Sequence, residues 1–251
     1  MPSKSDLDLY YKTVWTTSED VGIVYKIQAE ERVRYITRHI RLPGDAQILD
    51  VGSGHGLLYE AFKEQGFDQI AFFATDPSPE NLERLKKRGI SGFPDIASIG
   101  DRQFDLVTIC YVLEHVPDPL PFLSDIISHV KPGGYVFIDL PERDDTFKSL
   151  LEPHVVVYTE KSLLALADKT GLSVIHQTGY GQLRDLLIAE QDGIKLVKDI
   201  RNFLSGAESR LFTALFPEKS DDFMRKKLFE TYRFDEEGPD RWWIRSVMKK
   251  K

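Results

Sequence analysis

The sequence predicts an α/β protein built on a mainly parallel sheet, and three observations lead to this fold class. Short runs rich in β-branched and aromatic residues alternate with longer stretches whose apolar residues lie three and four apart. That alternation is typical of parallel strands joined by helices. The chain has 251 residues, 41% of them hydrophobic, which is enough for one large domain with a substantial core. Because no internal repeat or low-complexity tract interrupts the pattern, we expect residues 1–251 to form a single domain.

The first half of the chain is expected to contain three helices and three strands. Residues Gly22–Arg41 carry a helical stripe that Pro43 ends. The predicted elements that follow are the strand Gln47–Val51, the helix Leu57–Gln65 with Gly66 as its stop, the strand Gln69–Thr75, a helix that Ser78 caps and Pro79 opens and that ends near Gly89, and a short strand at Gly92–Pro94.

The second half continues the alternation and then departs from it. Its predicted elements are the strand Phe104–Tyr111, the helix Pro119–Val130, a turn at Pro132-Gly133-Gly134, the strand Tyr135–Leu140, a helix from Thr159 to Gly171, and the strands Leu172–Thr178 and Arg241–Met248. Between the last two strands, residues 181–240 show apolar stripes at helical spacing. We interpret residues 181–240 as a helical insertion into the domain, either a lid over a binding site or a dimer contact.

Composition and charge disfavour several classes of partner. The chain has 33 basic and 40 acidic residues, a net charge of −7, which disfavours nucleic acid and anionic lipid surfaces. The single cysteine, Cys110, excludes an internal disulfide and fits a reducing compartment. No apolar run approaches the ~18 residues of a membrane span, and the first residues lack a signal-peptide core. We therefore expect a cytoplasmic protein without a membrane span or a nucleic-acid partner.

The most informative segment is ILDVGSGHG, residues Ile48–Gly56, a strand followed by a glycine-rich turn. Glycines in such a turn allow positive φ and close approach of a ligand. A dinucleotide site usually requires glycine or alanine where this chain has Leu57. The acid ahead of the glycines, Asp50, suits an ammonium group better than a pyrophosphate. S-adenosylmethionine carries an ammonium and a sulfonium but no phosphate, so it fits this loop.

A second acid, Asp76, ends the predicted strand 69–75 and lies 26 residues after Asp50. A carboxylate at this place can accept hydrogen bonds from both hydroxyls of a ribose. That contact suits any adenosine-type ligand without a 2′-phosphate. Asp76 alone therefore leaves both NAD and S-adenosylmethionine open.

With these motifs in order, the chain resembles the class I S-adenosylmethionine-dependent methyltransferases over roughly residues 45–180. The segments that carry the resemblance are ILDVGSGHG, ATDPSPENLE, FDLVTICYVLEHVPDP and the stretch VKPGGYVFIDLP. The segments LEHVPDP and HVVVYTEKSL are similar to those of the ubiquinone-biosynthesis and sugar methyltransferases. The resemblance implies a doubly wound, seven-stranded, Rossmann-like sheet, with the helical insertion before its last strand.

The resemblance also implies roles for individual residues. The residues expected to bind S-adenosylmethionine are Asp50, Gly52, Ser53 and Gly54 in the loop, Asp76 at the ribose, Pro77, Asp95 and Ile96 at the adenine, and Cys110, Tyr111 and His115 after the fourth strand. Two of them have plainer alternatives, since Asp95 can cap a turn and Cys110 can be a packed small side chain. Residues 1–21 contain an aromatic cluster and are expected to cover the cofactor, with a simple packing role as the alternative.

Catalysis requires little from the protein beyond positioning, because the sulfonium donor is already activated. A base is needed only when the acceptor atom carries a proton. The candidates for that base are, in order, His154, His115 and Glu142. No metal site is expected, because the acidic pair Asp144-Asp145 has no third ligand spaced to join it.

The predicted function is therefore methyl transfer to a small molecule, with a hydroxyl oxygen of a metabolite or sugar as the expected acceptor. Two alternatives come from other classes. One is an NAD-dependent oxidoreductase, which the residue at Leu57 and the acid at Asp50 disfavour. The other is a methyltransferase-like subunit that binds the cofactor without catalysis. A homodimer is compatible with the apolar stripes of the insertion.

Overall fold

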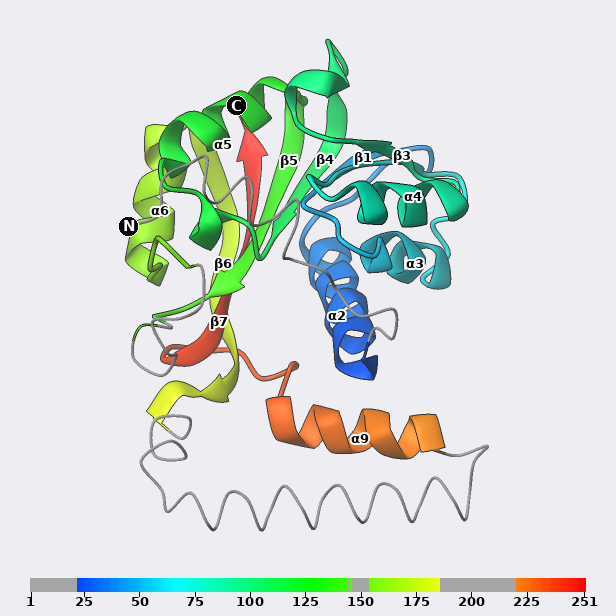
Figure 1. Ribbon diagram of the computed structural model, residues 1–251. Coiled ribbons are helices and arrows are strands. Elements are labelled where there is room, and N and C mark those ends of the chain that lie inside the picture. Colours follow the sequence, from blue (N-terminus) through cyan, green and yellow to red (C-terminus); the bar gives the residue numbers. More distant parts are fainter. Residues whose placement is uncertain (1–21, 144, 146–153, 186–219) are drawn as a thin grey trace.

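The computed structural model describes residues 22–143, 145, 154–185 and 220–251, which form a seven-stranded sheet flanked by helices (Figure 1). The strands lie in the order β3-β2-β1-β4-β5-β7-β6, and β7 runs antiparallel to both of its neighbours. Their bounds are β1 Gln47–Val51, β2 Ala71–Thr75, β3 Ser91–Phe93, β4 Phe104–Cys110, β5 Val130–Pro141, β6 Leu172–Leu183 and β7 Arg241–Lys250. The α/β prediction, with a mainly parallel sheet of seven strands, is confirmed.

Helices cover both faces of this sheet, as expected for a doubly wound fold. The α-helices are α2 Ile23–His39, α3 Leu57–Glu64, α4 Pro79–Lys87, α5 Pro119–Ser128, α6 Glu160–Lys169 and α9 Ser220–Tyr232, and two short 3₁₀ helices are η1 Ala97–Ile99 and η2 Leu113–His115. Side chains of α2, α3 and α4 form one core with the sheet, and side chains of α5 and α6 form the other. None of the helices in the described ranges is both long and apolar enough to cross a membrane.

The strand order fixes where a ligand can enter. From β1 the chain winds outward to β2 and β3, then returns to place β4 on the other side of β1. The connections after β1 and β4 therefore leave the sheet in opposite directions at their carboxyl ends. In open α/β sheets, this reversal opens a crevice in which ligands bind. The predicted glycine loop follows β1. Cys110 ends β4, and the residues up to His115 follow it, so both segments lie at this crevice.

Two boundaries differ from the sequence-based prediction by several residues, and the others by two at most. Strand β5 begins at Val130 and contains the segment Pro132-Gly133-Gly134, which the sequence predicts to be a turn before the strand. The pairing register with β4 shifts there, and Gly133 has a positive φ of 75°, so the segment forms a bulge within the strand. Strand β6 continues to Leu183, so the first residues of the predicted insertion 181–240 belong to the sheet.

The end of the insertion packs at the ligand-binding edge. A small core joins Ile27 of α2, Tyr180 near the end of β6, Trp243 near the start of β7 and Phe234, which follows α9. Because β7 is antiparallel, its start lies at the carboxyl edge of the parallel strands, and Figure 1 shows α9 at that end of the sheet. The predicted cofactor-covering segment 1–21 and the central part of the insertion, 186–219, lie outside the described residues.

Candidate functional site

The glycine loop is fastened to the end of β2 by its backbone. The amides of Gly52 and Ser53 both donate hydrogen bonds to the carbonyl oxygen of Thr75, at 2.8 and 3.1 Å. Gly52 has a φ of 69°, and a Cβ built on it would lie 2.5 Å from Cγ2 of Val112. Only glycine fits this position, because both the conformation and the space exclude a side chain.

Gly54 differs from Gly52 in what surrounds it. Its φ is also positive, at 53°, but a Cβ built on it would meet no heavy atom within 4 Å. The loop is therefore closed at Gly52, where it packs on the segment after β4, and open at Gly54. An open, side-chain-free backbone at the carboxyl end of β1 is where a ligand can approach the chain closely.

Asp76 holds the open part of this loop in place. Its Oδ2 accepts a hydrogen bond of 2.8 Å from the amide of Gly54. Its Oδ1 accepts hydrogen bonds from the amide of Ser78 at 2.9 Å and from Nδ2 of Asn81 at 3.1 Å. Burial raises the pKa of the Asp76 carboxyl, while these hydrogen bonds oppose the rise. Asp76 thus links the ends of β1 and β2 and lies at the place predicted for a ribose contact.

Asp50 is a buried carboxylic acid at the end of β1. The hydroxyl of Thr108, its register partner on β4, donates a hydrogen bond of 2.6 Å to Asp50 Oδ1. Burial raises the pKa of Asp50 to about 7, against the opposing effects of that hydrogen bond and of Arg32. Near neutral pH the group therefore lies close to its midpoint of ionisation, and a cation brought beside it would stabilise the charged form.

Two of the three predicted adenine contacts have other partners in the structure. Oδ1 of Asp95 accepts hydrogen bonds from the amide and hydroxyl of Ser98, at 2.8 and 2.6 Å, and so closes the turn that leads into η1. Ile96 packs in the core on the α5 and α6 face of the sheet, whereas Pro77 is exposed. The alternative in which Asp95 caps a turn thus describes this structure, and the adenine contact stays a prediction.

Cys110 and Tyr111 end β4 at the crevice. Cys110 packs against the α2, α3 and α4 core, and burial raises the pKa of its thiol, which keeps the thiol protonated. Tyr111 has a positive φ of 56°, and its hydroxyl accepts a hydrogen bond of 3.2 Å from Nε2 of Gln28. The guanidinium of Arg32 lies 4.8 Å from the centre of its ring. Tyr111 is thus held against α2 by two side chains.

A buried ion pair beside Tyr111 was not predicted from the sequence. Nε of Arg32 on α2 lies 2.5 Å from Oδ2 of Asp139 on β5, and the hydroxyl of Tyr180 donates to both Asp139 oxygens, at 2.8 and 2.9 Å. This network could have been suspected from the sequence, because Asp139 is an acid inside the apolar strand segment VFIDLP. A charge inside a buried strand requires a partner. The pair fixes α2 against the crevice.

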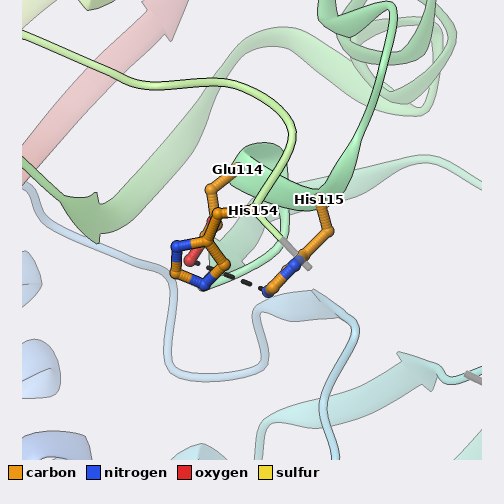
Figure 2. A group of neighbouring side chains, drawn as sticks. All are labelled: Glu114, His115 and His154. Atoms are coloured by element: carbon orange, nitrogen blue, oxygen red, sulfur yellow. Dashed lines mark ion pairs between the residues drawn. The ribbon is translucent and has the colours of Figure 1, made fainter. Parts of the chain in front are cut away.

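Two of the predicted catalytic residues, His115 and His154, lie side by side near the carboxyl end of β4. The amides of Val155 and Val156 donate hydrogen bonds to the carbonyl oxygen of Glu114, at 2.8 and 3.1 Å, which brings His154 to η2. The rings of His115 and His154 have their centres 4.6 Å apart, and Nε2 of His115 lies 4.0 Å from Oε1 of Glu114. Figure 2 shows the three side chains gathered around one point. The sequence analysis did not single out Glu114.

Glu142, the third catalytic candidate, is occupied by other contacts. Its Oε2 lies 3.0 Å from Nη1 of Arg184, and its backbone bridges to Tyr158. Burial raises the pKa of the Glu142 carboxyl, while Arg184 opposes the rise. The structure therefore brings His115 and His154 together and places Glu142 in an ion pair at the end of β5.

Comparison with known proteins agrees with this geometry. A family model described as a methyltransferase domain matches residues 25–177. The ubiquinone biosynthesis O-methyltransferase of Xanthomonas campestris pv. campestris is 34% identical over 122 residues, which cover 45% of this chain and 49% of the relative. The enzyme of that name from Hydrogenovibrio crunogenus is 29% identical over 165 residues, 62% of this chain and 65% of the relative. The match thus spans about half to two thirds of these curated relatives.

Among solved structures, a phosphoethanolamine N-methyltransferase of Haemonchus contortus, in complex with phosphomonomethylethanolamine and S-adenosylhomocysteine, superposes with a TM-score of 0.56. It is 18% identical, and the superposition covers 100% of this chain and 60% of that one. At this level of identity, the similarity shows a shared fold and nothing about function.

Proposed function

Because the chain belongs to the methyltransferase-domain family and has the class I S-adenosylmethionine-dependent methyltransferase fold, we propose that it transfers a methyl group to a hydroxyl oxygen of a small molecule. The observation that carries this proposal is the buried acid Asp50 next to a loop that is open at Gly54. An ammonium group placed there would stabilise the Asp50 carboxylate, whereas a phosphate would destabilise it.

The residues at the crevice fit S-adenosylmethionine. Asp50, Gly52, Ser53 and Gly54 would hold the methionine part, and Asp76 would accept hydrogen bonds from the ribose hydroxyls. Oδ2 of Asp76 accepts one hydrogen bond and has acceptor capacity left for the ribose, whereas Oδ1 already accepts two. Pro77, Asp95 and Ile96 would border the adenine, and Cys110, Tyr111 and His115 would border the ligand at the end of β4. When bound, the cofactor supplies a methyl group on a positively charged sulfur, which keeps the electron pair as the methyl carbon bonds to the acceptor.

The protein's part is to position the acceptor and to manage its proton. An acceptor hydroxyl must lose its proton as the new bond forms, and an imidazole suits that task near neutral pH. His154 and His115 lie side by side next to the segment that packs on Gly52, so they are the best-placed candidates. Glu142 is less suited, since Arg184 already pairs with it.

Several features support a small acceptor. The curated relatives act, by their names, in ubiquinone biosynthesis and on oxygen, which supports a hydroxyl acceptor for this chain. The acidic composition, with a net charge of −7, argues against a nucleic-acid acceptor. The position of α9 at the carboxyl edge supports a role for the insertion as a wall of the acceptor pocket, with a homodimer contact as the second choice. A cytoplasmic location is part of the same proposal.

The experiment is a transfer assay with a labelled methyl group on S-adenosylmethionine. The full chain is incubated with separate panels of phenols, sugars and primary amines, and both the labelled product and S-adenosylhomocysteine are quantified. We expect stoichiometric formation of both with at least one hydroxyl acceptor. Transfer confined to amines would contradict the oxygen acceptor. Binding of the cofactor without transfer to any panel would favour the non-catalytic subunit.

A further inference from the structure

We propose that Glu114, His115 and His154 form a binding site for a divalent transition-metal ion, of which Zn²⁺ is the representative. These three side chains each offer one ligand atom, and the three atoms lie within 4.8 Å of one another (Figure 2). The sequence analysis expected no metal site; it considered His154 as a base, and His115 both as a base and as a cofactor contact. The third member, Glu114, comes from the structure.

The backbone holds the two halves of this site together. Glu114 and His115 belong to η2, directly after β4, whereas His154 precedes the segment that leads into α6. The two hydrogen bonds from Val155 and Val156 to the carbonyl oxygen of Glu114 fix the second segment on the first. Tyr158 adds a hydrogen bond of 3.4 Å from its hydroxyl to the carbonyl oxygen of Leu113. The site therefore rests on main-chain contacts, which a substitution of one ligand side chain would leave in place.

The distances leave space for an ion. The 4.0 Å between Oε1 of Glu114 and Nε2 of His115 is about twice a zinc–ligand bond of ~2.0–2.1 Å. Ligand atoms around a tetrahedral zinc lie ~3.3 Å apart by that bond length, so small side-chain rotations would bring the three atoms to bonding distance. The carboxylate of Glu114 is 1% exposed and His115 is 14% exposed, so the site is buried on one side and reachable on the other.

The choice of ion follows from the ligands. Imidazole nitrogen suits Zn²⁺ and its neighbours in the first transition row, whereas Mg²⁺ and Ca²⁺ prefer oxygen ligands alone. A buried carboxylate next to two imidazoles also matches the general finding that buried charges are paired or coordinate metals. Three protein ligands leave at least one coordination position open, as in catalytic rather than structural zinc sites.

The position of the site indicates what the open position would hold. Val112, which contacts Gly52 in the glycine loop, is two residues before Glu114, so the ion would lie beside the part of the crevice where the acceptor enters. With the ion bound, the two imidazoles would act as ligands in place of their role as bases. The cation lowers the pKa of a coordinated hydroxyl, so the acceptor oxygen would bind as its anion and release its proton to solvent. This last step rests on the proposed function, whereas ion binding itself does not.

The test is a titration of the untagged full chain with Zn²⁺ by calorimetry, with Mg²⁺ as a second titrant. We expect one Zn²⁺ per chain, weaker binding of Mg²⁺, and a loss of Zn²⁺ affinity of tenfold or more in His154→Gln and in Glu114→Gln. The matched control is His129→Gln, which lies outside the site and should bind Zn²⁺ as the wild type does. Co²⁺ added to the wild type should give the visible absorption of an imidazole-coordinated ion.

Two results would overturn the proposal. One is the absence of stoichiometric Zn²⁺ binding by the wild type, together with no Co²⁺ spectrum. The other is unchanged Zn²⁺ affinity in variants that are folded. Binding of S-adenosylhomocysteine, followed by thermal shift in the same samples, serves as the folding control and tests the cofactor site separately. A chain that binds S-adenosylhomocysteine but no Zn²⁺ would reject the metal site and leave the proposed function standing.

Discussion

The amide of Gly54 donates a hydrogen bond of 2.8 Å to Oδ2 of Asp76. Through this contact, Asp76, where a ribose would bind, holds Gly54, where the glycine loop is open. Two loops that follow different strands are thus positioned as one unit. A change at Asp76 should therefore affect both the cofactor contact and the shape of the loop.

We predict that Asp76→Ala lowers the affinity for S-adenosylhomocysteine by about tenfold or more. At least one hydrogen bond to a charged acceptor would be lost, worth roughly 1.5–3 kcal/mol. The melting temperature should also fall, because the amides of Gly54 and Ser78 and the side chain of Asn81 lose their acceptor. Calorimetry and thermal unfolding measure the two effects, with Asp101→Ala on the exposed surface as the control. Wild-type affinity in Asp76→Ala would remove Asp76 from the site.

Much of this fold and part of this site were predictable from the sequence, for a physical reason. Strand β1, the glycine loop and Asp76 follow from local signals, because glycines and a strand-ending acid are contiguous in the chain. The bulge in β5 was missed, since Gly133 and Gly134 read locally as a turn, whereas pairing with β4 keeps them in the strand. Contacts between distant segments were also missed, such as Arg32 with Asp139 and Glu114 with His154. Sequence periodicity carries no information on which distant side chains meet.

Gly52→Ala should distort the glycine loop and reduce cofactor affinity at least tenfold. The new Cβ would lie 2.5 Å from Cγ2 of Val112, on a backbone with a φ of 69° that side chains disfavour. Gly44→Ala is the matched control, because a Cβ there would meet nothing within 4 Å. Adding Val112→Ala to Gly52→Ala should restore part of the affinity by relieving the contact, although the backbone strain remains. Equal affinity of Gly52→Ala and Gly44→Ala would contradict the described packing.

The raised pKa of Asp50 predicts that the free energy of unfolding depends on pH. In the folded state its pKa is about 7, above the value of ~3.9 expected when unfolded. Between about pH 4 and about pH 7 the folded state therefore binds more protons than the unfolded state. The stability that the protonated Asp50 carboxyl contributes is lost as the pH rises through this range. Asp50→Asn should therefore gain stability relative to the wild type as the pH rises from about 5 to about 8. Urea unfolding at both pH values measures the difference.

The same group predicts the pH dependence of binding. An ammonium beside Asp50 favours its charged form, so the affinity of the wild type for S-adenosylhomocysteine should fall as the pH drops below about 7. Asp50→Asn should bind more weakly than the wild type above about pH 7, approach the wild-type affinity at low pH, and show a flatter profile. Parallel profiles for the two proteins would assign the pH dependence to another group.

We predict that the part of the insertion at residues 186–219 is required for the acceptor and not for the cofactor. Replacing it with a short Gly/Ser linker retains α9 and Phe234, which pack against Tyr180 and Trp243. The shortened chain should bind S-adenosylhomocysteine as the full chain does and lose transfer to its acceptor. A gel-filtration comparison of both chains tests the alternative of a dimer contact. Normal transfer by the shortened chain would exclude the insertion from the acceptor pocket.

The central claim is that the glycine loop after β1, together with Asp50 and Asp76, binds S-adenosylmethionine. The most direct measurement is a calorimetric comparison of S-adenosylhomocysteine with NAD on the same preparation of the full chain, repeated with Asp50→Asn. The claim predicts one S-adenosylhomocysteine per chain, no detectable heat with NAD, and a clear loss of affinity in the variant. Stoichiometric binding of NAD without binding of S-adenosylhomocysteine would contradict it and assign the loop to a dinucleotide.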